Sequence, residues 1–235
     1  NQINYLKDLR KSAGSKPIIL VLKSGSAIDL SEIYDYVDAI IYAWYLGEQG
    51  GNAIADIIFG DVNPSGKLPI TIPESLSHLP DYNNYSMDNR TYRFTKHKPM
   101  YPFGYGLSYS NFVYSDISIK KEQIINGDSI ELNFTIHNDS EIPGEEVVQI
   151  YIKDLKASYR TPNSSLIYFK RLFLDSGERR KINFIVNKDM MSTFNEKGNK
   201  EIESGIFKIF VGGSSPGERS QELGKSIKEA IFSVE

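Results

Sequence analysis

The sequence has 235 residues, with 27 Lys and Arg against 30 Asp and Glu, a net charge of −3 and 40% hydrophobic residues. This balance is typical of a globular chain and excludes the basic footprint of a nucleic-acid binder. No apolar run approaches the ~20 residues of a membrane-spanning helix, and the lack of cysteine excludes disulfides and thiolate metal sites.

The chain opens inside a secondary-structure element. Residues 1–6 read Asn-Gln-Ile-Asn-Tyr-Leu, with neither an initiator methionine nor a basic-then-apolar signal pattern. They lead straight into an amphipathic segment that stops near Gly14. Such a start predicts that the chain is part of a longer protein. A processed N-terminus is the alternative that composition leaves open.

Two apolar runs predict neighbouring strands in the first half. Residues 18–22 read Ile-Ile-Leu-Val-Leu, and residues 39–44 read Ala-Ile-Ile-Tyr-Ala-Trp. Runs rich in β-branched residues are typical of strands covered on both faces. A helix opened by residues 47–51 and ended by Gly60 follows the second run. This alternation predicts part of a mostly parallel α/β sheet, whose other strands we expect before residue 1.

Prolines, glycines and tyrosines dominate residues 61–109, which show little periodicity. Compact domains seldom keep so long an irregular stretch unless it is functional or lies across a surface. The many aromatic residues favour a segment pinned to the domain surface over a flexible linker.

From Phe112 onward the hydrophobic period becomes two. Apolar and polar residues alternate in four segments, at 130–137, 148–152, 182–186 and 207–211, with turn-forming clusters between them. Short strands with one apolar face predict an antiparallel β-sandwich. The tail after Gly212 is rich in Ser, Gly and charge, and we expect it to be only partly ordered.

The sequence contains no cofactor-binding or metal-binding motif with the correct spacing. Residues 60–67 superficially resemble a Walker loop, but five residues separate the glycines and Leu68 stands where a hydroxyl should bind Mg²⁺. Turn chemistry explains this stretch better. The three histidines are scattered, and His137 falls on the polar face of its strand, where we expect solvent exposure. The sequence therefore predicts no metal site and no cofactor.

The carboxyl ends of the two predicted strands are the candidate ligand site. Ligands of open α/β sheets gather at this edge, which here carries Ser24, Trp44 and Glu48. Trp44, the only tryptophan, is either core packing or a platform for a sugar ring. Glu48 either binds substrate or is an ordinary acidic residue in the first turn of a helix. Turn or cap chemistry also accounts for Ser24.

Several long motifs run in a fixed order along the chain. Residues 43–56 read Ala-Trp-Tyr-Leu-Gly-Glu-Gln-Gly-Gly-Asn-Ala-Ile-Ala-Asp, residues 59–69 read Phe-Gly-Asp-Val-Asn-Pro-Ser-Gly-Lys-Leu-Pro, and residues 101–109 read Tyr-Pro-Phe-Gly-Tyr-Gly-Leu-Ser-Tyr. Val147-Val148-Gln149-Ile150-Tyr151 and Gly212-Gly213-Ser214-Ser215 follow. In this order the motifs resemble glycoside hydrolase family 3 over nearly the whole chain. Leu46 stands where the family usually has proline.

The resemblance implies an architecture and an activity. Residues 1–110 would be the C-terminal part of the family's α/β sandwich domain, with its long irregular connection, and residues 111–235 an all-β fibronectin type III-like domain. Members of the family are retaining exo-β-glycosidases, chiefly β-glucosidases and β-xylosidases. Their Asp nucleophile lies in an N-terminal barrel, and their Glu acid/base lies in a loop upstream of the Ala-Trp-Tyr segment. We therefore expect no catalytic residue in this chain, Glu48 included.

The segment 85–93 resembles the form common in bacterial β-xylosidase-like members. It favours xylo-oligosaccharides only weakly, because related glucosidases share it. Arg90 is the substrate-binding candidate of this segment. Pinning the long connection onto a domain surface is the alternative that we favour for Arg90.

Three hypotheses compete for the function. The leading one is that a longer protein hydrolyses an oligosaccharide or aryl β-glycoside, with this chain as one wall of the cleft beside a barrel domain of the same protein. The rival is a carbohydrate-binding module that stacks sugars on Tyr151, Tyr159 and Tyr168, although these tyrosines could equally be core or domain-interface residues. The third is a homodimer formed through the sandwich. We predict no nucleic-acid and no membrane partner, and the sequence leaves the compartment open.

Overall fold

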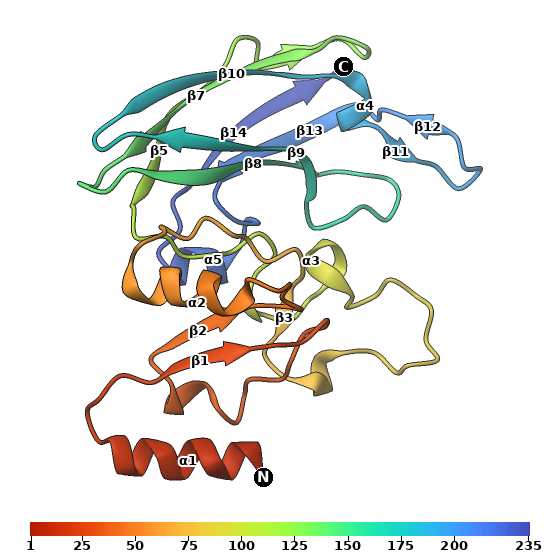
Figure 1. Ribbon diagram of the computed structural model, residues 1–235. Helices are drawn as coiled ribbons and strands as arrows, with labels where there is room; N and C mark the ends of the chain where they lie inside the picture. The colour runs from red at the N-terminus through yellow and green to blue at the C-terminus, as the bar shows by residue number, and fades with distance from the viewer.

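The first part of the chain folds as helices around a small sheet. The computed structural model describes all residues from Asn1 to Glu235. The elements in chain order are α1 (Gln2–Ala13), β1 (Ile19–Leu22), a 3₁₀ turn (Tyr34–Tyr36), β2 (Ala39–Tyr42) and α2 (Gly50–Phe59). Figure 1 shows α1 below and α2 above the β1–β2 pair, so that the two helices flank it.

The predicted parallel pairing of the two apolar runs is confirmed. β1 and β2 pair in parallel from Ile19 opposite Ala39 to Leu22 opposite Tyr42. Within these 235 residues the strands are covered only in part, because Ile19 and Ala39 are exposed and the other strand residues, apart from Leu22, are half-buried. Coverage of both faces stays a prediction for the longer protein. Two strands with one helix on each side leave much of their apolar surface open, and a pair alone is only marginally stable in water.

α2 ends as its sequence predicts but begins later. Gly60 has φ 86 in the left-handed region, and its N–H donates to the Ile57 carbonyl at 3.3 Å. This conformation carries little steric penalty only for glycine. The helix begins at Gly50, so Glu48 precedes it and is not in its first turn.

The irregular segment 61–109 is pinned to the first part, as its aromatic composition predicts. It contains β3 (Ile72–Pro73), a 3₁₀ turn (Leu76–His78), α3 (Thr91–Phe94) and β4 (Pro99–Tyr101). β3 and β4 pair antiparallel. A hydrophobic core joins them to the preceding elements through these buried residues: Leu6, Leu22, Leu30, Ile33, Ile72 and Met100.

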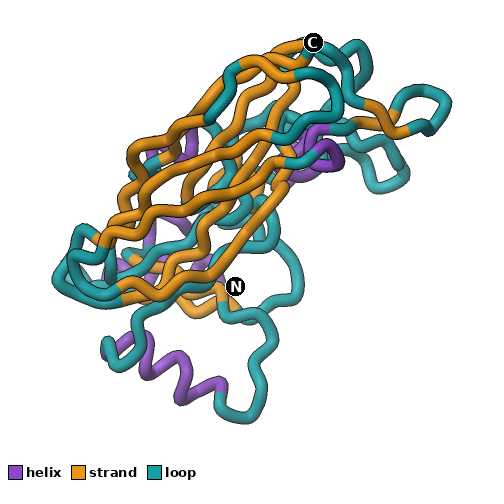
Figure 2. The backbone as a smooth tube through the Cα atoms, turned by 90° about the horizontal axis from the view of Figure 1, so that it is seen from above, coloured by secondary structure: helices purple, strands orange, loops and turns teal.

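The second part is a β-sandwich of two mostly antiparallel sheets, which Figure 2 shows from above. One sheet has the order β10-β7-β5 and the other the order β6-β14-β13-β8-β9. Its strands are β5 (Phe112–Ile119), β6 (Gln123–Ile124), β7 (Ile130–Asn138), β8 (Gly144–Asp154), β9 (Ser165–Leu174), β10 (Arg179–Val186), β13 (Gly205–Gly212) and β14 (Ile227–Val234). The short helices α4 (Lys188–Met191) and α5 (Glu218–Glu222) and the hairpin of β11 (Thr193–Phe194) with β12 (Lys200–Glu201) complete it.

The alternating pattern correctly predicts the inner faces of the sandwich. A single core of 18 buried residues lies between the sheets, and the residues of the predicted apolar faces belong to it or pack against it. In β7 the buried members are Ile130, Leu132, Phe134 and Ile136. Burial of such side chains is worth about 1.5–3 kcal/mol each.

Two expectations for this half are wrong. The tail after Gly212 is ordered, since it forms α5 and then β14, which lies between β6 and β13 in the larger sheet. Phe232 and Val234 are buried, whereas Ile231 between them and the start of the strand is exposed. This alternation indicates a strand, but the Ser- and Gly-rich stretch before it concealed the pattern. His137 is not freely exposed either, because its side chain is only 15% accessible and lies 3.8 Å from Asp139. No helix in the structure is both long and apolar enough to span a bilayer.

Candidate functional site

The loops that follow β1 and β2 meet at the carboxyl edge of the small sheet. The Ala43 N–H continues the strand pairing by donating to the Leu22 carbonyl at 2.9 Å. In the first loop the Ser24 hydroxyl donates to the Ser26 carbonyl at 3.0 Å and accepts from the Ser26 N–H at 3.2 Å. Ser24 therefore holds a tight turn, and its hydroxyl is exposed at the loop surface.

Aromatic rings connect the two loops. The Tyr42 hydroxyl donates to the Ser26 carbonyl, and the Tyr42 ring lies 4.7 Å from the Trp44 ring at 50°. Burial raises the pKa of Tyr42, so the phenol stays protonated and is available as a donor. Trp44 has φ 54, a left-handed conformation that costs an L-residue roughly 1–2 kcal/mol. Backbone strain of this kind, at a residue whose side chain is only half-buried, is typical of a functional loop.

Close packing fixes the second loop against the first. A Cβ on Gly25 would lie 2.7 Å from the Tyr45 ring, and a Cβ on Gly50 would lie 2.4 Å from Leu46 Cβ. Position 50 therefore requires glycine, whereas at position 25 a larger residue would displace the exposed Tyr45 ring. Tyr45 itself presents an 80% exposed ring at this edge, and Leu46 packs against the start of α2 in the turn where the family usually has proline.

Glu48 and Arg90 differ in their surroundings. Glu48 is exposed beside this edge, two residues before α2 begins. The Arg90 guanidinium instead binds its own loop, donating to the carbonyl oxygens of Ser86 at 3.0 Å and of Asn84. The structure thus brings Ser24 and Trp44 together through Tyr42 and Ser26, whereas Arg90 braces the segment 81–86.

The edge offers hydroxyls and aromatic rings but no pair of carboxylates for bond cleavage. The carboxyl group whose pKa burial raises is Asp154, assisted by the nearby Glu203. It lies on β8 of the sandwich and accepts a hydrogen bond from the Lys156 N–H at 2.9 Å. No group of three or more His, Asp or Glu residues is placed to hold a metal ion. The chemistry that this edge supports is recognition of a polyhydroxylated ring by stacking and hydrogen bonding.

Sequence reasoning missed the role of residues 63–67, which it treated as a simple turn. The Asn63 amide N–H donates to the Pro143 carbonyl at 3.0 Å, and the Ser65 hydroxyl donates to Glu145 at 3.2 Å. Lys67 forms an ion pair with Glu146 at 3.0 Å. Asn63, Ser65 and Lys67 occupy every second position of an extended segment, so their side chains lie on one side of it. This alternation of polar residues is the signal that predicts an extended segment packed against another part of the chain.

The junction buries charged groups. The side chains of Lys67 and Glu146 are 9% and 4% accessible. The Tyr114 hydroxyl donates to the second Glu146 oxygen at 3.3 Å, and burial raises the pKa of this phenol well above its usual value. Burial, with repulsion from Lys67, lowers the pKa of Lys225 to about 8. One carboxylate thus faces two ammonium groups and a phenol between the two parts.

A second set of contacts joins residues 101–109 to β8. The Gln149 amide donates to the Gly104 carbonyl at 3.0 Å, and the Tyr151 hydroxyl donates to Gln149 at 2.5 Å. The Tyr92 ring stacks on Phe103 with centroids 4.4 Å apart. Tyr151 is fully buried in this contact. The hypothesis that Tyr151 offers a sugar-stacking surface is therefore wrong.

Comparison with known families and proteins agrees with this geometry. Residues 1–109 match the glycosyl hydrolase family 3 C-terminal domain, and residues 146–215 match the fibronectin type III-like domain. A protein of Formosa agariphila is 41% identical over 204 residues, which are 85% of this chain and 27% of that protein. Thermostable β-glucosidase B of Acetivibrio thermocellus is 38% identical over 212 residues, 84% of this chain and 28% of that protein.

Solved structures extend the likeness to the whole fold. The crystal structure of a family 3 β-glucosidase from Bifidobacterium adolescentis matches with a TM-score of 0.85 and 29% identity, covering 99% of this chain and 35% of that one. The β-glucosidase of Listeria innocua in complex with glucose matches with a TM-score of 0.83 and 30% identity, over 99% of this chain and 32% of that one. The chain thus spans between a quarter and about a third of these relatives. It belongs to glycoside hydrolase family 3, with that family's C-terminal α/β domain followed by its fibronectin type III-like domain.

Proposed function

We propose that this chain is the C-terminal portion of a retaining exo-β-glycosidase that hydrolyses terminal β-D-glucosides or β-D-xylosides. In this proposal the nucleophile and the acid/base belong to a barrel domain and an upstream loop of the same protein, and residues 1–235 supply one wall of the substrate cleft. The sandwich acts as a buttress. Support comes from the family relatives, which are β-glucosidases and β-xylosidases.

The observation that carries the proposal is the edge built by Ser24, Tyr42 and Trp44. Its rings and hydroxyls match what a sugar-binding wall needs, since an aromatic ring can stack on the apolar face of a pyranose while hydroxyls bind its oxygens. A retaining glycosidase needs two carboxyl groups about 5–5.5 Å apart, and this edge carries only Glu48. We therefore assign Trp44, Ser24 and Glu48 to the cleft wall and leave the bond-breaking step to other residues.

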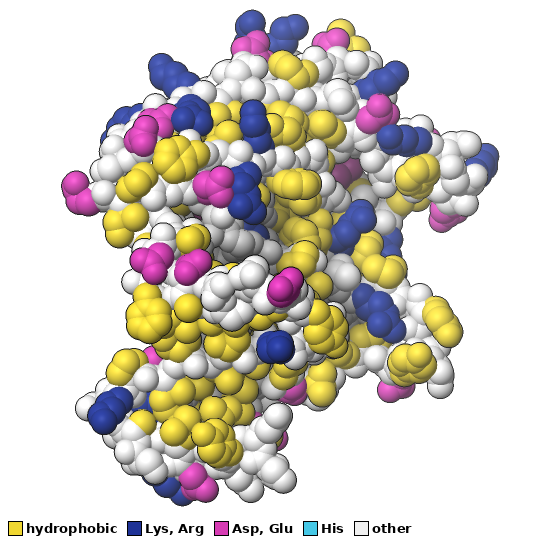
Figure 3. All heavy atoms as spheres, viewed as in Figure 1, with side chains coloured by type: hydrophobic (Ala, Val, Ile, Leu, Met, Phe, Trp, Pro, Cys, Tyr) yellow, Lys and Arg dark blue, Asp and Glu magenta, His cyan; other side chains and the backbone are white.

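An exposed apolar surface supports contact with a further domain. Figure 3 shows hydrophobic side chains gathered over the lower half of the molecule. The exposed members in this half include these residues: Tyr5, Ile19, Tyr34, Ile58, Phe59 and Val62. Large apolar patches on a protein surface mark interaction sites. We propose that the barrel domain and the remaining strands of the sheet cover this surface in the longer protein.

Within the chain we propose two domains, residues 1–110 and 111–235. Two separate hydrophobic cores support this division, one formed by residues up to Met100 and the other by residues from Tyr114 onward. The connection between them, at 101–110, is held by hydrogen bonds to β8. We accordingly expect the two parts to move as one body.

Hydrolysis assays on two proteins test the proposal. Nitrophenyl β-glucoside and nitrophenyl β-xyloside are offered to the 235-residue chain and to the longer protein that contains it. We expect turnover by the longer protein alone. Turnover by the 235-residue chain would show that the catalytic pair lies within it and would overturn the proposal. The ratio of kcat/KM for the two substrates decides whether residues 85–93 indicate a xylosidase.

Homodimer formation through the sandwich stays a prediction. The two sheets of the sandwich present exposed apolar side chains, among them Phe169 and Phe173 on β9. Light scattering over a wide concentration range tests it, since a dimer of this chain would approach twice its 26.6 kDa mass. A constant monomer mass would overturn the prediction.

A further inference from the structure

A groove with a volume of about 610 Å³ lies at the junction of the two parts, away from the carboxyl edge of β1 and β2. One side is formed by residues 92–102 together with Thr71, and the other by Lys153, Asn163, Phe210 and residues 215–221 of the sandwich. This volume is within the range of small-molecule sites. The lining of the groove combines charged and polar side chains with three prolines and two hydrophobic residues.

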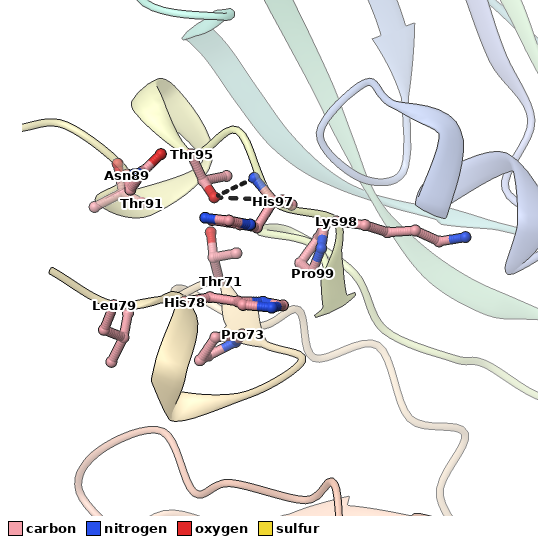
Figure 4. Close-up of a pocket in the computed structure, with 10 residues that line it drawn as sticks. All are labelled: Thr71, Pro73, His78, Leu79, Asn89, Thr91, Thr95, His97, Lys98 and Pro99. Carbon is pink, nitrogen blue, oxygen red and sulfur yellow. Dashed lines mark hydrogen bonds between the residues drawn. The ribbon is translucent and has the colours of Figure 1, made fainter.

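A smaller cavity of about 40 Å³ adjoins this groove and shares Thr71, Thr95, His97, Lys98 and Pro99 with it. Figure 4 shows the rings of His78 and His97 lying face to face beside Thr71. Their centroids are 4.3 Å apart, and the planes differ by 10°. The cavity and the groove are therefore neighbours that share part of their lining.

Two polar atoms in this cavity have no hydrogen-bond partner. Thr71 Oγ1 and His78 Nδ1 are both buried and unpaired. Leaving a buried polar atom unsatisfied costs about 1–3 kcal/mol, so native structures rarely keep two of them in one place without a function. At about 40 Å³ the cavity has room for one small polar group, and both atoms belong to residues that line it.

The groove also carries an excess of positive charge. Lys96, Lys98, Lys153 and Arg219 line it, against the single carboxylate of Glu218. Lys98 and Arg219 are paired with Glu222, whereas Lys96 and Lys153 have no carboxylate within ion-pair distance. The chain as a whole is acidic, so this local excess is a property of the groove and not of the surface in general.

We propose that this groove binds an acidic saccharide, with a hydroxyl of one sugar ring bound by Thr71 and His78 and the carboxylate of the saccharide bound by Lys96 and Lys153. The Phe210 ring offers contact for the apolar face of a sugar. A hydrogen bond in which one or both groups are charged is stronger than a hydrogen bond between two neutral groups. The saccharide class rests on the proposed function, whereas the site itself rests on the groove.

Binding measurements on the 235-residue chain test this proposal without any hydrolysis. The probes are xylotriose that carries a glucuronic acid branch, unbranched xylotriose, and inorganic phosphate, each titrated calorimetrically at low and high salt. We expect the acidic probe to bind at least about tenfold more tightly than the neutral one. Its affinity should also fall at 0.5 M NaCl, because salt screens exposed charges.

Variants locate the site. Lys96→Met/Lys153→Met should weaken binding of the acidic probe at least about tenfold, and Thr71→Val, which removes only the hydroxyl, should weaken it about fivefold or more. The matched control is Lys121→Met/Lys170→Met, which removes two exposed lysines outside the groove and should change nothing. Circular dichroism melting confirms that each variant folds.

Three results would overturn the proposal. These are equal binding of the acidic and neutral probes, equal binding by the wild type and the groove variants, or full competition by phosphate at equal concentration, which would indicate an anion site only. Failure here differs from failure of the proposed function, because hydrolysis by the longer protein is measured separately and does not depend on this groove.

Discussion

Lys67 and Glu146 form an ion pair of 3.0 Å across the junction between the α/β part and the sandwich, with both side chains almost inaccessible to water. Lys67 belongs to the extended segment that follows α2, and Glu146 belongs to β8. A Cβ on Gly213 would lie 2.3 Å from Glu146 Oε1 and 3.6 Å from Lys67 Nζ, so the backbone itself closes over the pair. The two parts are therefore joined by charge as well as by packing.

Replacement of Glu146 by Gln should destabilise the chain by about 3–5 kcal/mol, because it leaves the Lys67 ammonium buried without a counter-charge. The midpoint and slope of urea unfolding measure this effect. The double variant Lys67→Met/Glu146→Gln removes both charges of the pair and should recover part of this loss, with Lys225 left facing a neutral side chain. If the double variant were as unstable as the single one, packing and not charge would dominate at this site.

Lys225 should make stability depend on pH. Burial, with Lys67 nearby, lowers its folded-state pKa to about 8, against an unfolded value near 10.5. Between these values the unfolded chain binds more protons than the folded one, so the free energy of unfolding rises with pH across this window. Below pH 8 the buried ammonium reduces that free energy by at most about 3 kcal/mol.

Lys225→Met keeps the aliphatic stem and removes the charge. We expect the variant to be more stable than the wild type at pH 7, with the difference shrinking between pH 8 and 10.5. Urea unfolding at several pH values measures the difference. A difference that stays constant with pH would show that Lys225 titrates normally in the folded chain.

Gly106→Ala should destabilise the junction by about 2–3 kcal/mol. Its Cβ would lie 2.1 Å from the Gly66 carbonyl oxygen, and the Leu68 N–H to Tyr105 carbonyl bond of 2.9 Å holds the two segments together. Gly51→Ala is the matched control, since nothing lies within 4 Å of its Cβ and it is inside α2. That control should gain up to about 1 kcal/mol in helix propensity. Thermal unfolding distinguishes the two.

Trp44→Ala in the longer protein should raise KM for nitrophenyl glycosides about tenfold, because a lost stacking ring is worth roughly 1 kcal/mol or more. The melting temperature should change little, since the ring is only half-buried. Tyr82→Ala, at a loop position with a 93% exposed ring, is the control and should leave KM unchanged. An unchanged KM in the Trp44 variant would assign this ring to packing alone.

Local periodicity was enough to predict most elements. The run at 18–22 and the alternation at 130–137 identify strands because a strand's burial repeats along its own sequence. Gly60 identifies a helix end for the same local reason, since its backbone conformation is set by its neighbours. The parallel pairing of β1 with β2 was predicted from the alternation of apolar runs with other segments, although only a 3₁₀ turn lies between these two strands.

Long-range contacts could not be predicted in this way. The partners of Asn63 and Lys67 are Pro143, just before β8, and Glu146 on β8, each about 80 residues away, and nothing in the local pattern specifies them. Thr71 and His78 line one cavity only because the segment around β3 and the 3₁₀ turn folds against residues 95–99. The continuous apolar runs of β1 and β2 predict strands that are covered on both faces. They do not identify the residues that cover them, and within these 235 residues the two strands are covered only in part.

The position of β14 bears on how the molecule is made. This strand, Ile227–Val234, is inserted between β6 and β13, and it pairs with β6 in parallel. A nascent chain can therefore not close its larger sheet until residue 234 has left the ribosome, although β5 to β13 emerge earlier. Until then the edge of β13 is open to pairing with another chain. Ribosomes stalled before residue 227 should consequently hold a sandwich that is protease-sensitive and prone to aggregate.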